Sequence, residues 1–429
     1  EERGDRREGR GSTPKDEILG GEERGYQGGR RGRSRSPLRS RTASAETSKT
    51  EGGIKEDPSN KGTWEENWKL RPTDFPDAIL LPNATMAKRL LGICAEGLDF
   101  VQESRLPATV LADLEAQIAA NQYAGRVLEG MGDPELLCTW MKHLYDVARE
   151  SVARVIAELP PGNAADRIGG VGINLKLSKK TGRLHIDFGG TGGPHRGNLN
   201  APTAVVRAAV LYALRVLVDR HIPLNEGALA DIELVIPENS LLSPPTGAAV
   251  VGGNVETSQR LVDLFFRAVG VRASSQGTMN NLTMGGDGWS YYETLGGGFG
   301  ATCAHPGLSG RQVHMTNTKI TGVEVLEVRF PVCVRRMAYR PNSGGQGKKR
   351  GGDGLVREFE ALEDMEVALL ATRRESGAPG MAGGAAGLPG NDEVFREGAW
   401  ASWNGDTLVL RAHERVRIQT PGGGGYGGL

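Results

Sequence analysis

Residues 183–220 read RLHIDFGGTGGPHRGNLNAPTAVVRAAVLYALRVLVDR, which places a strand, a glycine-rich loop and a long apolar helix in succession. The alternating apolar residues at the start predict the strand. Asn200 and Pro202 suit the cap and the first turn of the helix. The preceding run VGINLKLS predicts a second strand, joined by a hairpin across KKTG. These elements favour an α+β fold of mixed sheets with packed helices.

Helices are predicted on both sides of this stretch. Upstream, the apolar spacing is helical from Pro107 to Leu159, and Asp133-Pro134 marks the start of a second helix, because proline suits a first turn. The apolar stripe of this second helix consists of Leu136, Leu137, Trp140, Met141, Leu144 and Val147. Downstream, ADIELVIPENSLL predicts a strand and a turn, and NVETSQRLVDLFFRAVG predicts another helix.

The remainder of the chain is predicted to be β-rich, with glycine loops at 296–300, 344–354, 380–390 and 422–428. We expect one domain over residues 75–429, with a helical part (105–160), an α/β part (165–285) and a β-rich part (286–429). Residues 1–74 are predicted to be a disordered, low-complexity tail, since residues 1–62 contain almost no apolar side chains.

Composition argues against several classes of protein. Lys and Arg total 52, as do Asp and Glu, so the chain offers no electrostatic case for binding nucleic acid or an anionic membrane. The basic run Arg30–Arg41 is either an RNA-binding arm or a solvated tail. No apolar run approaches the ~20 residues of a membrane span. Four widely spaced cysteines, none in a CxxC pair, favour free thiols over a zinc ribbon or a disulfide framework.

Two features near the opening stretch suggest ligand binding. The loop GGTGGPHRGN precedes a helix, so its backbone N–H groups and the helix dipole could cradle an anion, although it lacks the GxxxxGK[ST] pattern of a P-loop. His185 and Asp187 lie two residues apart on a predicted strand and therefore share a face. They are either a metal-binding pair or a carboxylate paired with a neighbouring histidine.

Other polar residues concentrate in three short runs. In GGNVETSQR, helix capping accounts for Asn254 and Thr257. In GTMNNLTMG, the paired amides Asn280 and Asn281 suggest either substrate hydrogen bonding or a turn. The run HMTNTKITGVEVLE, from His314 to Glu327, is either part of an active site or a strand that is polar at one end. A hydroxyl nucleophile beside a histidine base is a known mechanism, but spacing alone identifies no acid that would orient the imidazole.

The order of these runs resembles the hydantoinase B/5-oxoprolinase family. The blocks that carry the resemblance are DFGGTG…GNLNAP, IPLNEGAL, VVGGNVETSQRLVD, SSQGTMNNLTMG, YYETLGGGFGA, HMTNTKITGVEVLE, SGGQGKKRGGDGLVRE and TPGGGGYG. The resemblance covers about residue 105 to the end. Gly189 and Gly322 stand where the family's pattern has serine and aspartate.

The resemblance implies a cytosolic enzyme of glutathione turnover that opens 5-oxo-L-proline to L-glutamate while hydrolysing ATP. Relatives open hydantoins or carboxylate ketones. ATP is expected on a hydantoinase A-like partner, which activates the ring by phosphorylation, and the B-like part handles the activated cyclic amide. A divalent metal and a homo-oligomer are compatible with the resemblance. The family's upstream His/Asp block has no match in residues 1–104, so we expect a chain that is N-terminally truncated relative to the family.

The resemblance also suggests one substrate cleft. Three residues are assigned as catalytic: His314, Thr316 and Asp187. Nine are assigned to substrate binding: Thr191, Asn198, Asn200, Asn254, Glu256, Thr257, Asn280, Asn281 and Asn317. Their expected roles are hydrogen bonds to the ring amide and carboxylate and orientation of a water molecule. The alternative is a non-catalytic assembly partner of a hydantoinase A-like subunit.

Overall fold

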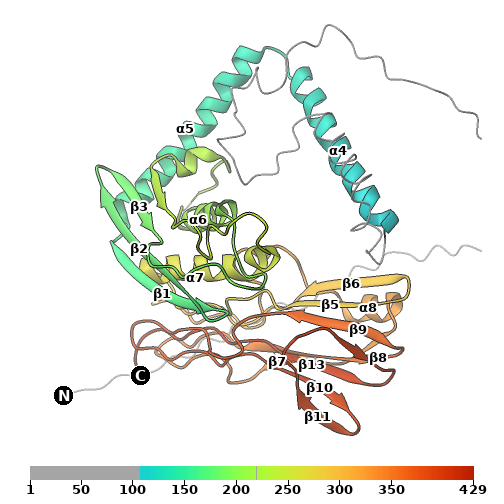
Figure 1. Cartoon of the computed structure of the whole chain (residues 1–429). Coiled ribbons are helices and arrows are strands. Elements are labelled where there is room, and N and C mark those ends of the chain that lie inside the picture. The colour runs from blue at the N-terminus through green and yellow to red at the C-terminus, as the bar shows by residue number, and fades with distance from the viewer. Residues whose placement is uncertain (1–106, 219) are drawn as a thin grey trace, which may run out of the picture. The chain divides into compact units, whose positions relative to one another are not determined.

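The computed structural model describes residues 107–218 and 220–429, and the predicted tail over 1–74 lies outside them. Helices pack against three β-sheets (Figure 1), which confirms the α+β class. In the part of the chain that the structure describes, no helix has the length and apolar character needed to cross a bilayer.

Two long helices form the predicted helical part: α4 (Pro107–Gly130) and α5 (Pro134–Glu158). Asp133 caps α5 by accepting a hydrogen bond from the Glu135 amide at 2.9 Å, as its position before proline predicts. Most of the predicted apolar stripe of α5 is exposed, Trp140 by 56% and Leu144 by 46%. Only the later turns of α5, with Ala148, Val152 and Ile156, join the core.

The first sheet has the strand order β1-β2-β3-β4 and holds the predicted hairpin. Its strands are β1 (Gly162–Ile168), β2 (Val171–Lys180), β3 (Arg183–Asp187) and β4 (Ile232–Val235). Only the β3–β4 pair is parallel. The sequence GNAADRI contains few apolar residues, which explains why β1 was not predicted.

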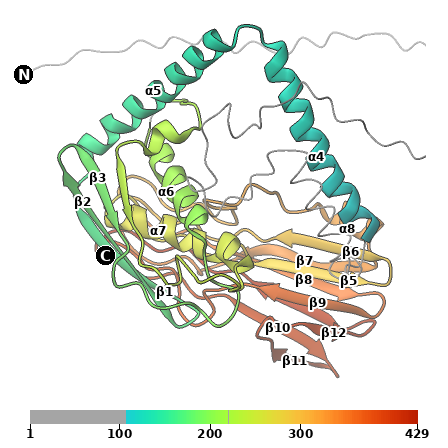
Figure 2. The same ribbon diagram turned by 45° about the horizontal axis from the view of Figure 1, so that its top comes forward.

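Helices cover one face of this sheet (Figures 1 and 2). They are α6 (Thr203–Leu217) and α7 (Ser258–Ala268), with short turns at Glu226–Leu229 and Gly253–Thr257. Ile173 and Ile186 of the sheet, Val206 of α6 and Phe265 of α7 belong to one buried cluster. Because side chains alternate along a strand, the neighbouring residues of β2 and β3 face away from this core.

Two further sheets enclose a second core. One has the order β12-β9-β5-β6 and the other β11-β10-β13-β8-β7. The strands are β5 (Asn281–Gly286), β6 (Trp289–Thr294), β7 (Val332–Arg340), β8 (Gly354–Ala361), β9 (Met365–Leu370), β10 (Asn391–Arg396), β11 (Ala399–Ser402), β12 (Leu408–Leu410) and β13 (Arg415–Gln419). Leu282, Val367, Phe359 and Val416 pack together between them.

The strand interpretation of His314–Glu327 is wrong. Residues 314–322 form neither helix nor strand, and α8 (Val323–Arg329) follows them. His314 has a φ of 47°, a left-handed conformation that no extended strand contains. A β-branched composition suggested a strand, but hydrogen bonds to other segments determine this path, as described below.

The C-terminal segment 421–427 is an extended chain enclosed by other extended chains. Its N–H groups donate to surrounding segments, and groups three residues apart reach the same segment. Gly422 and Gly425 donate to the carbonyls of Leu388 and Ala385, which lie on one segment. Gly423 and Tyr426 donate to the carbonyls of Gly352 and Lys349 on a second segment, and Gly424 donates to the carbonyl of Ser274 on a third. Three residues per turn without internal hydrogen bonds is the geometry of a polyproline II helix, which leaves every N–H for a neighbour.

Glycine is required because the neighbouring chains approach so closely. A Cβ atom added to any residue from Gly422 to Gly425 would lie 1.9–2.2 Å from a backbone carbonyl oxygen. These oxygens belong to Phe299, Pro379, Ser343 and Gln346, and they lie on three separate segments because Ser343 and Gln346 share one loop. The glycine loops of the sequence therefore form a packed bundle of backbones.

We predict that Gly423→Ala destabilises the fold by at least about 3 kcal/mol, because its Cβ would lie 2.0 Å from the Phe299 oxygen. The matched control is Gly193→Ala, since a Cβ at Gly193 meets nothing within 4 Å, and it should change stability by less than about 0.5 kcal/mol. Urea denaturation followed by circular dichroism measures both. Equal stability of the two variants would contradict the close-packed bundle.

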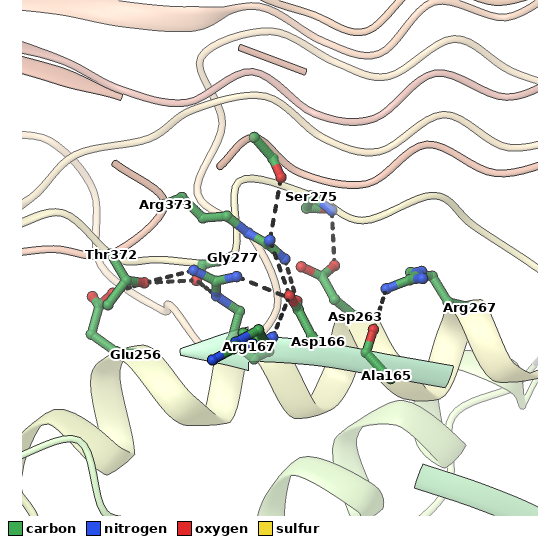
Figure 3. A network of polar contacts seen from close by, with 12 residues as sticks. Ala165, Asp166, Arg167, Glu256, Asp263, Arg267, Ser275, Gly277, Thr372 and Arg373 are labelled. Atoms are coloured by element: carbon green, nitrogen blue, oxygen red, sulfur yellow. Dashed lines mark hydrogen bonds and ion pairs between the residues drawn. The ribbon is translucent and has the colours of Figure 1, made fainter. Parts of the chain in front are cut away.

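A buried ion network links the two cores (Figure 3). Asp166 of β1 is 7% exposed and accepts hydrogen bonds from Arg260 of α7 at 3.3 Å and from Arg373 beyond β9 at 3.2 Å. Burial alone would raise the pKa of Asp166, but the Arg260 and Arg373 guanidiniums outweigh it and hold the pKa below its usual value of 3.8. Burial, with Arg373 nearby, lowers the pKa of Arg260 to about 10, which leaves it charged at neutral pH.

Because the folded pKa of Asp166 is depressed, its contribution to stability is present above about pH 4 and is lost as the pH falls below that value. Asp166→Asn should therefore cost about 3–5 kcal/mol at pH 7 and flatten the acid limb of the stability curve. Thermal unfolding from pH 2.5 to 7 measures this. Asp231→Asn, which removes an exposed pair with Arg149, is the control and should cost less than about 1 kcal/mol.

Candidate functional site

Helix α7 and the turn before it carry a line of polar side chains that are buried. Glu256, Arg260, Asp263 and Arg267 are spaced by four, three and four residues, so they lie on one side of the helical segment. The first three are at most 2% exposed. Figure 3 shows this side facing the loop segments that contain Ser275 and Gly277 and those that contain Thr372 and Arg373. The polar side of α7 therefore binds other segments of the chain.

Glu256 binds two of these segments through its carboxylate. One oxygen accepts hydrogen bonds from the Met279 amide at 3.0 Å and the Asn281 side chain at 2.9 Å. The other accepts from the Thr372 hydroxyl at 2.7 Å. Complete burial raises the pKa of Glu256, whereas these donors oppose that rise. The surrounding donors occupy the carboxylate, which suits it to fixing the positions of the two loops.

Asp263 binds His314, which spacing alone could not pair with an acid. The His314 Nε2 lies 2.9 Å from the Asp263 Oδ1, and both side chains are at most 2% exposed. The same carboxylate oxygen accepts the Ser275 amide at 2.8 Å. The rings of Tyr212 and Phe266 lie 6.0 and 5.6 Å from the imidazole. A carboxylate and aromatic rings therefore fix the imidazole in one orientation.

This pairing has a chemical consequence for the histidine. An ionised carboxylate only accepts hydrogen bonds, so the pairing favours the tautomer that carries hydrogen on Nε2. The lone pair on Nδ1 is then the basic site of the ring. An imidazole oriented by a carboxylate in this way can take a proton from water and be stabilised as the imidazolium.

Thr316 lies beside this pair but is held by another residue. Its hydroxyl oxygen accepts a hydrogen bond from the Gln259 amide at 2.9 Å. Gln259 precedes Asp263 by one helical turn, so α7 holds residues 314 and 316 by two adjacent contacts. Gln259 Oε1 and Asp263 Oδ2 are buried without a hydrogen-bond partner. A direct His314–Thr316 bond is not among the contacts of the described residues.

The paired asparagines are buried and bind other protein groups. Asn280 donates to Gln276 Oε1 at 2.9 Å and accepts from Arg374 at 2.9 Å. Asn281 donates to Glu256 and accepts from the Tyr292 hydroxyl at 2.7 Å. Contact of either amide with a substrate would require these bonds to open, so a substrate-binding role for them stays a prediction.

Three residues that were expected to cap helices make no side-chain cap bond, although Thr257 does stand at the N-cap position of α7. The side chain of Thr257 donates to the Leu199 carbonyl and makes no cap bond, and Asn254 lies inside a π-helical turn that makes no side-chain cap bond. Helix α6 has Pro202 at its N-cap, without a side-chain cap bond. Asn200 instead donates to the carbonyls of His195, Gly197 and Ala249. For Thr257 and Asn200, a contact with a distant segment, at Leu199 and Ala249 respectively, takes the place of a local cap.

The Asn200 contacts close the loop that was predicted to cradle an anion. The His195 amide donates to Asn200 Oδ1 at 2.7 Å, the Gly192 amide to Gly172 and the Gly197 amide to the His195 ring. These N–H groups are therefore already engaged.

The remaining predicted asparagines lie at or near the surface. Asn198 is half-buried, and its backbone carbonyl accepts the Gly252 amide at 2.7 Å. Asn254 and Asn317 are exposed.

Asp187 and Thr191 lie apart from His314. Ile186 belongs to the core under α6 and α7, so Asp187 is on the outer face of the first sheet. Its Oδ1 accepts a hydrogen bond from the Gly189 amide at 2.7 Å. His185 pairs with Glu233 at 3.2 Å, and this ion pair takes the place of the predicted pairing of His185 with Asp187. Within the described residues, no three His, Cys, Asp or Glu side chains are grouped to hold a metal ion.

The predicted residues therefore fall into two regions. His314, Thr316, Glu256, Asn280 and Asn281 gather around α7. Asp187 lies on the outer face of the first sheet, and the hydroxyl of Thr191 accepts the backbone N–H of Asn174 in β2. Two surface cavities, of about 350 and 240 Å³, are lined by none of the twelve. A single cleft formed by all twelve stays a prediction.

Sequence reasoning missed Gln259, Asp263, Arg260, Asp166 and Arg373. The spacing of charged residues along the predicted helix was visible, but a charged helix face ordinarily indicates solvent. Two features of the sequence indicated that α7 is buried on both sides. The face opposite its charged residues is apolar, and the neighbouring loops are rich in polar groups that need hydrogen-bond partners. The apolar residues are Leu261, Val262, Leu264, Phe265 and Phe266.

Comparison with known proteins identifies the family. The profile described as Hydantoinase B/oxoprolinase matches residues 79–428. The chain is 40% identical over 395 residues to 5-oxoprolinase 1 of Arabidopsis thaliana, covering 86% of this chain but 31% of that protein. The chain therefore spans less than a third of this relative's length.

Two solved structures share the fold. One is the ATP-dependent caprolactamase from Pseudomonas jessenii, with a TM-score of 0.62 at 21% identity, covering 74% of this chain and 61% of that one. The other is nucleotide-free acetone carboxylase, with a TM-score of 0.65 at 16% identity, covering 77% of this chain and 54% of that one. From the profile match and the 5-oxoprolinase likeness, we conclude that the chain belongs to the hydantoinase B/oxoprolinase family.

Proposed function

We propose that this chain is the hydantoinase B-like part of an ATP-dependent enzyme that opens 5-oxo-L-proline to L-glutamate in the cytosol. The likeness to a curated 5-oxoprolinase over most of the chain supports the substrate. The observation that carries the chemistry is the His314–Asp263 pair, because it supplies an oriented base shielded from bulk water. Hydantoins and ketones are the alternative substrates within the family.

His314 acts in this proposal as the base that accepts a proton from water as the water attacks the ring carbonyl carbon. The C–N bond of the ring then breaks, and its nitrogen takes that proton from the imidazolium. Asp263 orients the imidazole and stabilises its charged form. Gln259 positions Thr316, whose hydroxyl can hydrogen bond the ring amide or the attacking water. Asp187 has no part in this step because it lies on the outer face of the first sheet.

ATP is assigned to a hydantoinase A-like partner and not to this chain. Five backbone amides of the glycine-rich loop at 189–197 are engaged with protein acceptors: those of Gly189, Thr191, Gly192, His195 and Gly197. The sequence of the loop also lacks the lysine of a phosphate-binding loop. These observations support the assignment of the nucleotide to the partner. A divalent metal has no ligand group among the described residues.

A second candidate is a non-catalytic assembly partner of the same A-like protein. The exposed apolar residues of α4 and α5 favour it, among them Tyr123 (64% exposed), Trp140 (56%) and Met141 (47%). Isolated exposed apolar side chains are ordinary, but a series along two consecutive helices is typical of an interaction surface. Partner binding and catalysis are compatible, so the two candidates differ only in whether His314 is required.

The partner requirement predicts that this chain alone releases no glutamate from 5-oxoproline and ATP. Adding a hydantoinase A-like protein should restore glutamate release, because the ATP-binding residues would then be present. Coupled detection of glutamate and of ADP measures this. Turnover by this chain alone would contradict the division of the work between two parts.

The base assignment predicts that His314→Gln lowers kcat in the reconstituted enzyme by about 10²-fold or more. Glutamine can still donate a hydrogen bond to Asp263, so folding should be retained while the base is lost. Asp263→Asn should lower kcat by a comparable factor, because an amide can favour the wrong tautomer.

The matched control is His305→Gln, which changes an exposed histidine outside α4 and α5 and should leave kcat unchanged. Melting temperatures identify any variant that is merely unfolded. If folded His314→Gln retains the wild-type kcat in the complex, the catalytic proposal fails and the assembly-partner function is favoured.

A further inference from the structure

The outer face of the first sheet contains a cavity that the proposed reaction does not use. It has a volume of about 350 Å³ and is lined by Asn163, Ala164, Ala165, Asn174, Leu175, Lys176 and Gly189. This volume lies at the small end of the range for ligand pockets. The cavity opens on the side of β1 and β2 opposite the core that α7 covers, so it is separate from His314.

The wall of this cavity is preformed. Residues 189–192 turn back over β2, where the Asn174 side chain donates to the Gly190 carbonyl at 2.6 Å. The Thr191 hydroxyl accepts a hydrogen bond from the backbone N–H of Asn174 at 3.2 Å. The backbone N–H of Gly192 donates to the Gly172 carbonyl at 2.9 Å. A ligand would therefore enter without having to order this turn, which lowers the entropic cost of binding.

A row of polar residues crosses the sheet at one end of the cavity. The strand register places Asn163 opposite Lys176, and Lys176 opposite Asp187. In the next row, the small side chain of Ala165 lies opposite Asn174 and leaves the floor open. The row thus presents an amide, an ammonium and a carboxylate in order along one line.

The two charges of this row are available to a ligand. Lys176 and Asp187 are opposite in register, a position that normally favours an ion pair. Even so, among residues 107–218 and 220–429 no salt bridge includes Lys176. Asp187 uses Oδ1 to accept the Gly189 amide, which leaves Oδ2 as an acceptor. Asn174 donates to Gly190, which leaves its own oxygen as an acceptor beside the cavity.

We propose that this cavity binds a free α-amino acid that reaches Asp187 at its rim. Asp187 does not line the cavity, but it adjoins the lining residue Gly189, whose amide it accepts at 2.7 Å. The ligand's carboxylate pairs with the Lys176 ammonium and the Asn163 amide, and its ammonium group pairs with the Asp187 carboxylate and the Asn174 oxygen. A zwitterion matches this arrangement because it neutralises both protein charges, whereas a simple anion would face Asp187 and a simple amine would face Lys176. The inference does not depend on the proposed reaction.

Isothermal titration calorimetry of the full chain tests this with four probes: L-alanine, L-glutamate, propionate and ethylamine. Propionate is L-alanine without the ammonium group, and ethylamine is L-alanine without the carboxylate. We expect both amino acids to bind at least tenfold more tightly than propionate or ethylamine. Equal affinity of propionate and L-alanine would overturn the zwitterion assignment, and absence of binding by both amino acids would overturn the site.

Three variants locate the binding on the structure. Lys176→Met should weaken L-alanine binding at least tenfold by removing the cation, and Ala165→Leu should abolish it by filling the floor of the cavity. Lys180→Met, at the exposed end of the same strand, is the matched control and should change the dissociation constant less than twofold. Unchanged binding by folded Lys176→Met and Ala165→Leu would place the amino acid elsewhere and contradict the proposal.

Discussion

The buried polar side of α7 is the constraint on which the arrangement of the site depends. A helix that buries Glu256, Arg260 and Asp263 must supply each with partners, because an unpaired buried charge costs several kcal/mol. The partners come from β1, from the loops before β5 and after β9, and from the segment at 314–316. One helix therefore fixes the relative positions of segments more than two hundred residues apart in the chain.

This dependence separates what the sequence can predict from what it cannot. Apolar periodicity sufficed for α5, α6, α7 and the β2–β3 hairpin, because each of these elements is specified by its own side chains. It failed for β1, which carries Asp166 and small residues and becomes a strand because β2 pairs with it. It failed again at 314–322, where the path follows contacts to Gln259 and Asp263.

Candidate site residues show the same limit. His314 was recognisable as a candidate from its residue type and its neighbours, yet its carboxylate partner lies 51 residues earlier in the chain. Asn200, Asn280 and Asn281 were also conspicuous, but their amides hold backbone and side-chain groups of the protein itself. Polar residues that stand out in a sequence can thus support a site without touching its ligand, and only the fold distinguishes the two roles.

The glycine bundle has a consequence for how the chain is made. Residues 421–427 form the extended segment to which segments near 274, 299, 345, 352 and 385 attach, and they follow all of these segments in the chain. Contacts of such long sequence separation cannot form until residues 421–427 have been synthesised, which slows folding and leaves the β-rich part incomplete until then. Loss of these seven residues would remove the common partner of all these segments, so the closure of the β-rich part depends on one short run of glycines.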